Sequence, residues 1–203
     1  MSERAHSWDL DDTVFGRGGI VRGLGVVKAV IKPSRLQILT LDQIPEFTRN
    51  VADKPITSPL EMISYAAHAR RQLIPGIKEE MEEVVAAGED NYGNTGRSNK
   101  RQWVGMTETA LDRAGISNLL VDIFYTPDGV KTAVSKAAAI RALLTRYNKV
   151  THHEDDPRTA VFIASLFPDV NVVLVEYGST GRLFSSHEVD RFPNIRRSAK
   201  IRI

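Results

Sequence analysis

The stretch SWDLDDTVFG, residues 7–16, places three aspartates within four positions near the start of the chain. Carboxylates at such spacing repel one another, and aspartate favours neither strand nor helix. Solvent, a metal ion or a chemical role must therefore compensate for the crowding of Asp9, Asp11 and Asp12. A solvated acidic turn is the simplest explanation of an isolated D-x-D pattern. A metal-binding or chemical role is indicated only if other motifs in the chain support it.

Helices and strands are expected to alternate along the chain from residue 77 onward. Amphipathic patterns with end signals predict helices over 77–88, 100–115, 135–147 (capped by Ser135) and 157–167. Runs rich in β-branched and aromatic residues predict strands near 89–93, 118–127, 149–153 and 170–178. The polar segment GNTGR, residues 93–97, is expected to form a loop after the first of these strands. This alternation predicts an α/β fold, a Rossmann-like parallel sheet flanked by helices, with ligands at the carboxyl ends of the strands.

The first seventy residues are less regular. GRGGIVRGLGVVKAVIK, residues 16–32, mixes glycines with β-branched residues and predicts a short hairpin or flap, and a strand is possible over 35–41. A helix is expected over 58–74, capped by Ser58 with a proline at its first position. RAHSW, residues 4–8, is poor strand material, so any first strand is expected to be short or marginal.

Composition excludes several classes of protein. The chain has 203 residues and no cysteine, which excludes disulfides, zinc–thiolate sites and thiol catalysis. The formal net charge of +2 argues neither for nor against nucleic acid. No apolar run reaches membrane-spanning length, and the first ten residues lack the apolar core of a signal peptide, so we expect a cytoplasmic protein without a membrane partner.

Polar groups of a consistent kind follow four of the expected strands. They are Asp9-Leu10-Asp11-Asp12-Thr13, Asn94-Thr95-Gly96-Arg97, a lysine near a helix start (Lys136 or Lys131), and Glu154-Asp155-Asp156. In this order they resemble the four motifs of the haloacid dehalogenase-like (HAD) phosphohydrolases: D-x-D-x-[TV], a serine or threonine after a strand, a lysine, and an acidic pair. The resemblance covers residues 8–178. It implies a single HAD-like domain over 1–203, in which residues 33–73 form a small helical cap insertion.

The resemblance also implies a mechanism. Asp9 would be the nucleophile that forms an aspartyl-phosphate, and Asp11 the general acid and base. Thr95 and Lys136 would hold the transferring phosphoryl oxygens. Mg²⁺, which bridges carboxylates and phosphate oxygens, would be the cofactor.

The acidic pair and the lysine leave alternatives. Asp9, Asp11, Asp155 and Asp156 are the candidate metal ligands. Asp156 precedes a proline that suits the first position of a helix, so it is also a candidate cap, and Asp155, assisted by Glu154, is the preferred ligand of the pair. Lys136 suits the motif better than Lys131. At most one of the adjacent histidines at 152 and 153 can point toward the site, and packing or exposure is the simpler expectation for both.

The second motif suggests a substrate class. NTGRSNKRQWVGMTETAL, residues 94–111, is locally similar to the phosphatase domain of phage-type polynucleotide kinases, which makes Arg97 a candidate phosphate ligand. Lys100 and Arg101 would then flank a phosphate backbone, unless they are ordinary solvated residues. We therefore expect a Mg²⁺-dependent phosphomonoesterase, monomeric or homodimeric, acting on a nucleotide or a polynucleotide 3′-phosphate. The alternatives are a small-metabolite phosphatase and a non-catalytic HAD-like binding module. The basic tail, residues 191–203, is expected to be solvated.

Overall fold

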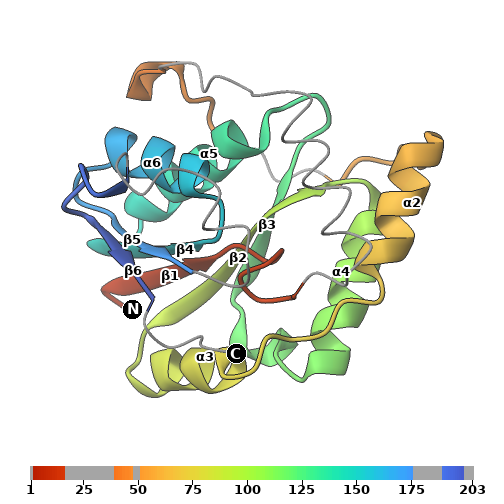
Figure 1. Ribbon diagram of the computed structural model, residues 1–203, viewed down its shortest axis with the longest axis horizontal. Helices are drawn as coiled ribbons and strands as arrows, with labels where there is room; N and C mark the ends of the chain where they lie inside the picture. Colours follow the sequence, from red (N-terminus) through yellow and green to blue (C-terminus); the bar gives the residue numbers. More distant parts are fainter. Residues whose placement is uncertain (1, 17–38, 48–50, 176–188, 199–203) are drawn as a thin grey trace.

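Six parallel strands form the centre of the molecule (Figure 1). The computed structural model describes residues 2–16, 39–47, 51–175 and 189–198. The strands lie side by side in the order β3-β2-β1-β4-β5-β6. Their bounds are β1 (Arg4–Trp8), β2 (Asp90–Ser98), β3 (Asp122–Thr126), β4 (Lys149–Glu154), β5 (Asn171–Leu174) and β6 (Ile195–Arg197). The predicted α/β fold with a parallel sheet is confirmed.

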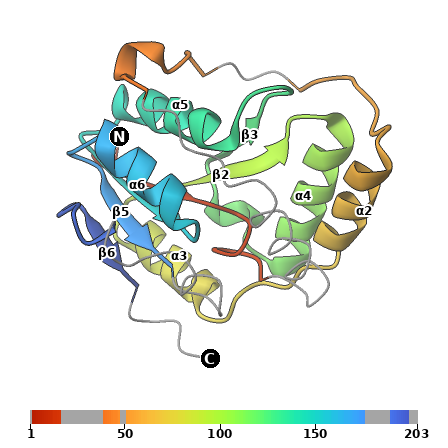
Figure 2. The same cartoon turned by 45° about the horizontal axis from the view of Figure 1, so that its top comes forward.

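The helices cover both faces of this sheet (Figure 2). They are α2 (Pro59–His68), α3 (Ile77–Ala86), α4 (Arg101–Ala114), α5 (Thr132–Leu144) and α6 (Pro157–Leu166), with short 3₁₀ turns at Leu41–Gln43 and Ser117–Leu119. One buried apolar cluster gathers α5 and α6 on one face, and a second gathers α3 and part of α4 on the other. No described helix is long and apolar enough to cross a membrane.

The first strand is short, as its composition suggested, but it is a central strand of the sheet and not a marginal one. β1 pairs along its length with β4 and, from Ala5 to Trp8, with β2. The indole N–H of Trp8 donates to Asn91 Oδ1 at 2.8 Å, and Asn91 Nδ2 donates to the carbonyl of Met81 in α3 at 3.0 Å. Pairing on two sides and burial of Trp8 therefore outweigh the weak intrinsic preference of this segment.

Several boundaries differ from the sequence expectations. Helix α2 ends at His68 instead of continuing to residue 74. Helix α5 begins earlier than expected, with Lys131 at the N-cap, so Ser135 is a buried residue inside the helix and not its cap. The GNTGR segment is not a loop, because β2 runs through it to Ser98, with a shift of register against β3 after Asn94. The basic tail contributes β6 at the edge of the sheet.

Two expectations concern segments that are only partly described. Apart from Gly16, the predicted flap at 16–32 lies outside the described residues, as does most of the possible strand at 35–41. Within 33–73, helix α2 packs against α4, where Tyr65 and His68 meet the ring of Trp103 edge to face. The assignment of 33–73 as a cap stays a prediction.

Replacing Trp8 with phenylalanine should lower the free energy of unfolding by about 2 kcal/mol, because the buried Asn91 Oδ1 loses its donor and part of the ring volume is left empty. Urea denaturation measures this loss. The control is Leu60→Ala, whose side chain is 78% exposed and whose replacement should change stability by no more than about 0.5 kcal/mol. Equal effects of the two substitutions would contradict the packing described for Trp8.

Candidate active site

The carboxyl ends of β1, β2 and β4 bring the motif residues to one edge of the sheet. Asp9 follows β1 directly, Thr95 and Arg97 lie in the last part of β2, and Glu154 ends β4. In the strand order, β1 and β4 are neighbours at the point where the chain changes its direction of winding. Ligands of doubly wound sheets bind in the crevice that such a change creates.

Lys136 joins the ends of the two central strands. Its ammonium lies 3.0 Å from Asp9 Oδ1 and 2.7 Å from Glu154 Oε2, and all three side chains are at least 94% buried. Burial alone would lower the pKa of Lys136, but the charges of Asp9 and Glu154 raise it well above its usual value. The lysine is therefore a permanent cation beside both carboxylates. Lys131, by contrast, is exposed at the N-cap of α5.

Four groups hold the carboxylate of Glu154: Lys136, His152 and two backbone N–H groups. Its Oε1 accepts the backbone N–H groups of Asp155 and Asp156, each at 3.1 Å, and its Oε2 lies 3.3 Å from Nε2 of His152. Burial would raise the pKa of Glu154, but Lys136 and His152 lower it to about 2. Glu154 is thus ionised and fixed in place. The sequence suggested for it only a secondary role, as a residue that assists Asp155 in binding the metal.

Three carboxylates here could hold a divalent cation. Ligand oxygens of Asp9, Glu154 and Asp155 all lie within 4.8 Å of one another. Burial raises the pKa of Asp9 and of Asp155, the latter well above its usual value with the charges of Asp9 and Glu154 adding to the effect. Oxygen ligands suit Mg²⁺, and Lys136 alone does not neutralise three carboxylates. The residues present therefore fit a hard divalent cation.

Asp156 lies in a different environment from Asp155. It is the N-cap of α6: its Oδ1 accepts the backbone N–H of Arg158 at 3.2 Å, and its Oδ2 accepts the hydroxyl of Thr159 at 3.0 Å. This is the capping role that the following proline indicated. Among the described residues, the acidic group that could bind a metal contains Asp155 but neither Asp156 nor Asp11.

Asp11 is surrounded by cationic groups. Arg97 donates from Nη2 at 2.6 Å and from Nε at 3.1 Å, and Arg71 donates from Nη1 at 2.8 Å. His68 Nε2 lies 3.6 Å from the other carboxylate oxygen. Burial would raise the pKa of Asp11, but Arg97, His68 and Arg71 together lower it well below its usual range. Asp11 is therefore a carboxylate at neutral pH in this arrangement.

Sequence reasoning missed Arg71 and His68. His68 is the last residue of α2 and Arg71 comes three residues later, about sixty residues after Asp11, and no motif surrounds them. Arg71 is 3% exposed in its side chain, which is unusual for an arginine unless it is paired. The only signal in the sequence was an arginine pair at the end of a predicted helix, which is common on solvated surfaces.

Asp9, Asp11 and Asp12 are close in sequence, but their side chains lie in different environments. Asp9 meets Lys136, and Asp11 meets the arginines. Asp12 has a left-handed backbone (φ 66°), which aspartate tolerates better than most residues, and it lies 3.8 Å from Arg71. Local cations and a tight turn therefore compensate for the repulsion that the sequence implied.

The remaining motif residues of β2 are buried beside this site. Thr95 Oγ1 accepts the backbone N–H of Arg97 at 3.1 Å, and the other guanidinium nitrogen of Arg97 donates to Thr107 in α4 at 3.0 Å. Gly96 between them is exposed, but a side chain there has little room, because a Cβ would lie 2.8 Å from the side chain of Thr132. Helix α4 therefore helps to orient Arg97.

Lys100 is engaged within the protein, whereas Arg101 is an exposed residue, so its contact with a phosphate backbone stays a prediction. The ammonium of Lys100 lies 2.9 Å from both oxygens of Glu61 in α2. Arg101 Nε lies 3.5 Å from the exposed carboxylate of Asp53. Lys100 in particular is engaged in holding α2 against α4.

Both histidines of β4 are buried. His153 stacks on Trp8 with ring centroids 3.6 Å apart and accepts or donates a hydrogen bond to His6 at 3.0 Å. His152 lies beside Glu154, and its other ring nitrogen is 3.1 Å from Ser7 Oγ. The expectation of packed residues fits both, although His152 also supports Glu154.

Replacing Lys136 with methionine should lower the free energy of unfolding by about 3–5 kcal/mol in the presence of a chelator, because two buried carboxylates lose their shared cation. Urea denaturation followed by circular dichroism measures this change. Lys131→Met is the matched control: the side chain is exposed, so the change should stay within about 0.5 kcal/mol. A loss at position 136 no larger than at position 131 would contradict the bridging role.

No protein-family model matches the chain, and no curated protein matches it in sequence. Solved structures do match. A protein from Clostridium difficile assigned as a phosphatase is 14% identical, with 98% of this chain and 95% of that chain covered at a TM-score of 0.58. A hydrolase of the haloacid dehalogenase-like family from Streptococcus pneumoniae is 13% identical, with coverages of 95% and 92% and a TM-score of 0.56.

The same fold also occurs in a protein that is named as a kinase and not as a hydrolase or phosphatase. Protein tyrosine kinase A from Mycobacterium tuberculosis is 17% identical, with 91% of this chain and 89% of that chain covered at a TM-score of 0.55. At such identities the likeness concerns the fold alone, and function has to be argued from the site. The chain has the fold of the haloacid dehalogenase-like hydrolases.

Proposed function

We propose that this chain is a Mg²⁺-dependent phosphomonoester hydrolase that acts through an aspartyl-phosphate on Asp9. The observation that carries the proposal is the buried bridge from Lys136 to Asp9 and Glu154, with Asp155 beside it. A nucleophilic carboxylate needs a nearby cation in order to approach a phosphate dianion, and the charged lysine at 3.0 Å supplies one. Bound Mg²⁺, held by Asp9, Glu154 and Asp155, would add Lewis-acid polarisation of the phosphoryl oxygens.

The reaction has two steps. An oxygen of Asp9 attacks phosphorus, the bond to the ester oxygen breaks, and the leaving alcohol takes a proton from Asp11. A water molecule then gives its proton to Asp11 and attacks phosphorus, which releases inorganic phosphate and restores Asp9. Lys136 and the Thr95 hydroxyl hold the phosphoryl oxygens in both steps.

Asp11 needs a change of environment to act as an acid, because Arg97 and Arg71 favour its ionised form. A substrate phosphate binds the same guanidinium groups through its oxygens, since planar guanidinium is well suited to phosphate. Once Arg97 turns from Asp11 to phosphate, the pKa of Asp11 rises and the carboxyl can carry the proton. Substrate binding and activation of the acid are thereby the same event.

Nucleotides and polynucleotide 3′-phosphates remain the substrate class we propose, on the local similarity around Arg97. The pairing of Lys100 with Glu61 removes one contact expected for a polymer, which makes a mononucleotide the simpler substrate. A small-metabolite phosphatase and a non-catalytic module with the same fold are the competing functions. A cytoplasmic location and a monomeric or homodimeric state also stay predictions.

Asp9→Asn should reduce phosphate release at least about a thousandfold, because the amide keeps the shape of the side chain but is a poor nucleophile. The assay compares nucleotides, 3′-phosphorylated oligonucleotides and sugar phosphates, each with Mg²⁺ and with a chelator. Circular dichroism checks that the variant is folded, and Asp169→Asn, at an exposed aspartate before β5, is the control. Turnover that survives in Asp9→Asn would exclude the covalent mechanism, and no turnover by the natural chain on any substrate would favour a binding module.

Asp155→Asn and Asp156→Ala should have opposite signatures. The first should weaken Mg²⁺ binding about tenfold or more, because a carboxylate ligand is lost. The second should cost about 1 kcal/mol of stability through the lost helix cap and leave the affinity for Mg²⁺ unchanged. Calorimetric titration with Mg²⁺ and urea denaturation of both variants provide the measurements. A loss of Mg²⁺ affinity in Asp156→Ala alone would reassign the ligand.

A further inference from the structure

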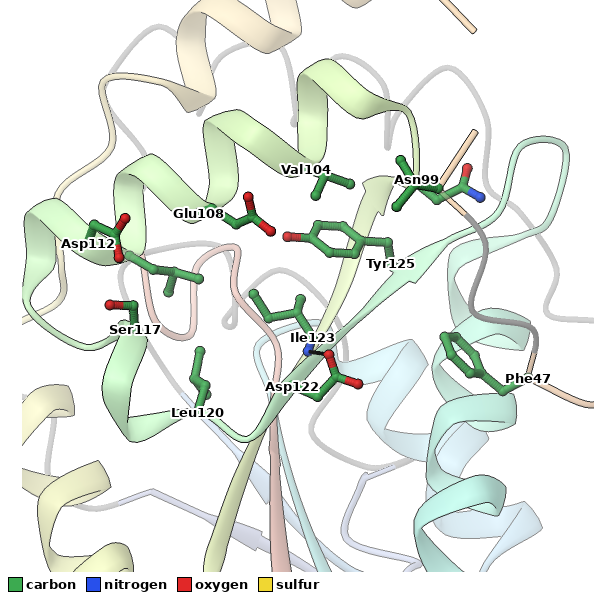
Figure 3. Close-up of a pocket in the computed structure, with 12 residues that line it drawn as sticks. Phe47, Asn99, Val104, Glu108, Asp112, Ser117, Leu120, Asp122, Ile123 and Tyr125 are labelled. Carbon is green, nitrogen blue, oxygen red and sulfur yellow. Dashed lines mark hydrogen bonds between the residues drawn. The ribbon is translucent and has the colours of Figure 1, made fainter. Parts of the chain in front are cut away.

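A cavity of about 430 Å³ lies between α4 and the edge strand β3 (Figure 3). None of the residues that line it belongs to the candidate active site, so the proposed hydrolysis leaves it without a role. Cavities of a few hundred cubic ångströms are typical of sites for small organic molecules. Its lining therefore indicates which kind of molecule would fit.

The lining combines apolar side chains with negative charge. Val104, Leu111, Leu120 and Ile123 supply aliphatic surface. Among the described residues that line the cavity, the charged ones are all acidic, namely Glu108, Asp112 and Asp122. A molecule that complements this surface has an apolar body and a positive charge.

Two of these carboxylates occupy unfavourable positions in α4. Glu108 and Asp112 are four residues apart, and like charges at that spacing destabilise a helix. Asp112 also lies in the last turn, where the helix dipole disfavours an anion. Neither carboxylate forms a salt bridge with another residue that the structure describes. An external cation would relieve both unfavourable interactions.

Tyr125 provides a polar group and a ring at the same place. Its side chain points from β3 toward Glu108 in Figure 3. The hydroxyl oxygen is buried and forms no hydrogen bond of acceptable geometry with a described residue. Because this oxygen is closed to solvent, a bound cation would meet the ring of Tyr125 and not its hydroxyl, and an aromatic ring attracts a cation.

Asp122 disfavours a peptide strand as the occupant. Its carboxylate accepts the backbone N–H of Ile123 at 2.7 Å, so this donor of the edge strand is not available to an added strand. A compact molecule that inserts between α4 and β3 does not need that donor.

We propose that this cavity binds a small organic cation, with an aromatic or aliphatic body against Val104, Leu111 and Ile123 and an ammonium or guanidinium group between Glu108 and Asp112. The shared chemistry is a cationic head on an apolar body of about ten to fifteen heavy atoms, the size that suits such a cavity. This proposal does not depend on the hydrolytic function, because the two sites share no lining residue.

Titration of the full chain with tryptamine tests the proposal, with tryptophol as the neutral analogue and indoleacetate as the anionic one. Amide chemical shifts and calorimetry give the site and the affinity. Tryptamine should bind at least about tenfold more tightly than tryptophol, because the charge-assisted contacts are lost in the alcohol, and indoleacetate should not bind. The affinity for tryptamine should fall as salt rises.

Glu108→Gln and Asp112→Asn should each weaken tryptamine binding about threefold or more, and together about tenfold or more, while binding of tryptophol stays the same. Both positions are exposed, so the variants should fold, which circular dichroism verifies. Asp169→Asn removes a distant carboxylate and should change nothing. Equal affinity for tryptamine and tryptophol, absence of saturable tryptamine binding, or unchanged affinity in the double variant would each overturn the proposal. Phosphate release is not part of this test, so failure of one proposal does not affect the other.

Discussion

The buried bridge from Lys136 to Asp9 and Glu154 is the interaction on which the candidate site depends. It joins the first turns of α5 to the ends of β1 and β4, two strands that are more than 140 residues apart in sequence. Burying one ammonium with two carboxylates costs desolvation energy that packing alone would not require. A hydrophobic substitute would give an equally compact sheet, so the charges are better explained by chemistry at this edge than by stability.

The strand order makes that bridge possible. Because β1 lies between β2 and β4, the chain leaves the centre in one direction through β2 and β3 and in the other through β4, β5 and β6. The loops that leave β1 and β4 therefore diverge and leave space above the two strands. Asp9 and Glu154 occupy the rim of that space, and Lys136 reaches it from the helix that crosses from β3 to β4. The strand order therefore creates the position of the site, and the motif residues supply the side chains that occupy it.

Sequence patterns were sufficient where one local rule dominated. Pro157 after Asp156 predicted both the start of α6 and the capping of that helix, and the alternation after residue 77 predicted the parallel sheet. Patterns were insufficient where distant partners decide. β1 is stabilised by two neighbouring strands, β6 pairs with β5 despite a basic sequence, and Arg71 becomes part of the site only when the end of α2 returns to Asp11. None of these contacts leaves a local signature in the chain.

The site has an acidic part and a basic part, and the two parts suit different ligands. Three carboxylates share the single cation Lys136, and the raised pKa values of Asp9 and Asp155 mark a place where further positive charge is favoured and a divalent cation fits. Asp11, two residues after Asp9, instead forms ion pairs with Arg97 and Arg71. A phosphate could replace its carboxylate as the partner of these two arginines. A phosphomonoester bound across both parts would have its oxygens near cations on either side and its phosphorus near Asp9. A general anion-binding module would need only the arginines, and a metal-binding module only the carboxylates. The presence of both beside one buried carboxylate therefore favours phosphoryl transfer over either kind of binding alone.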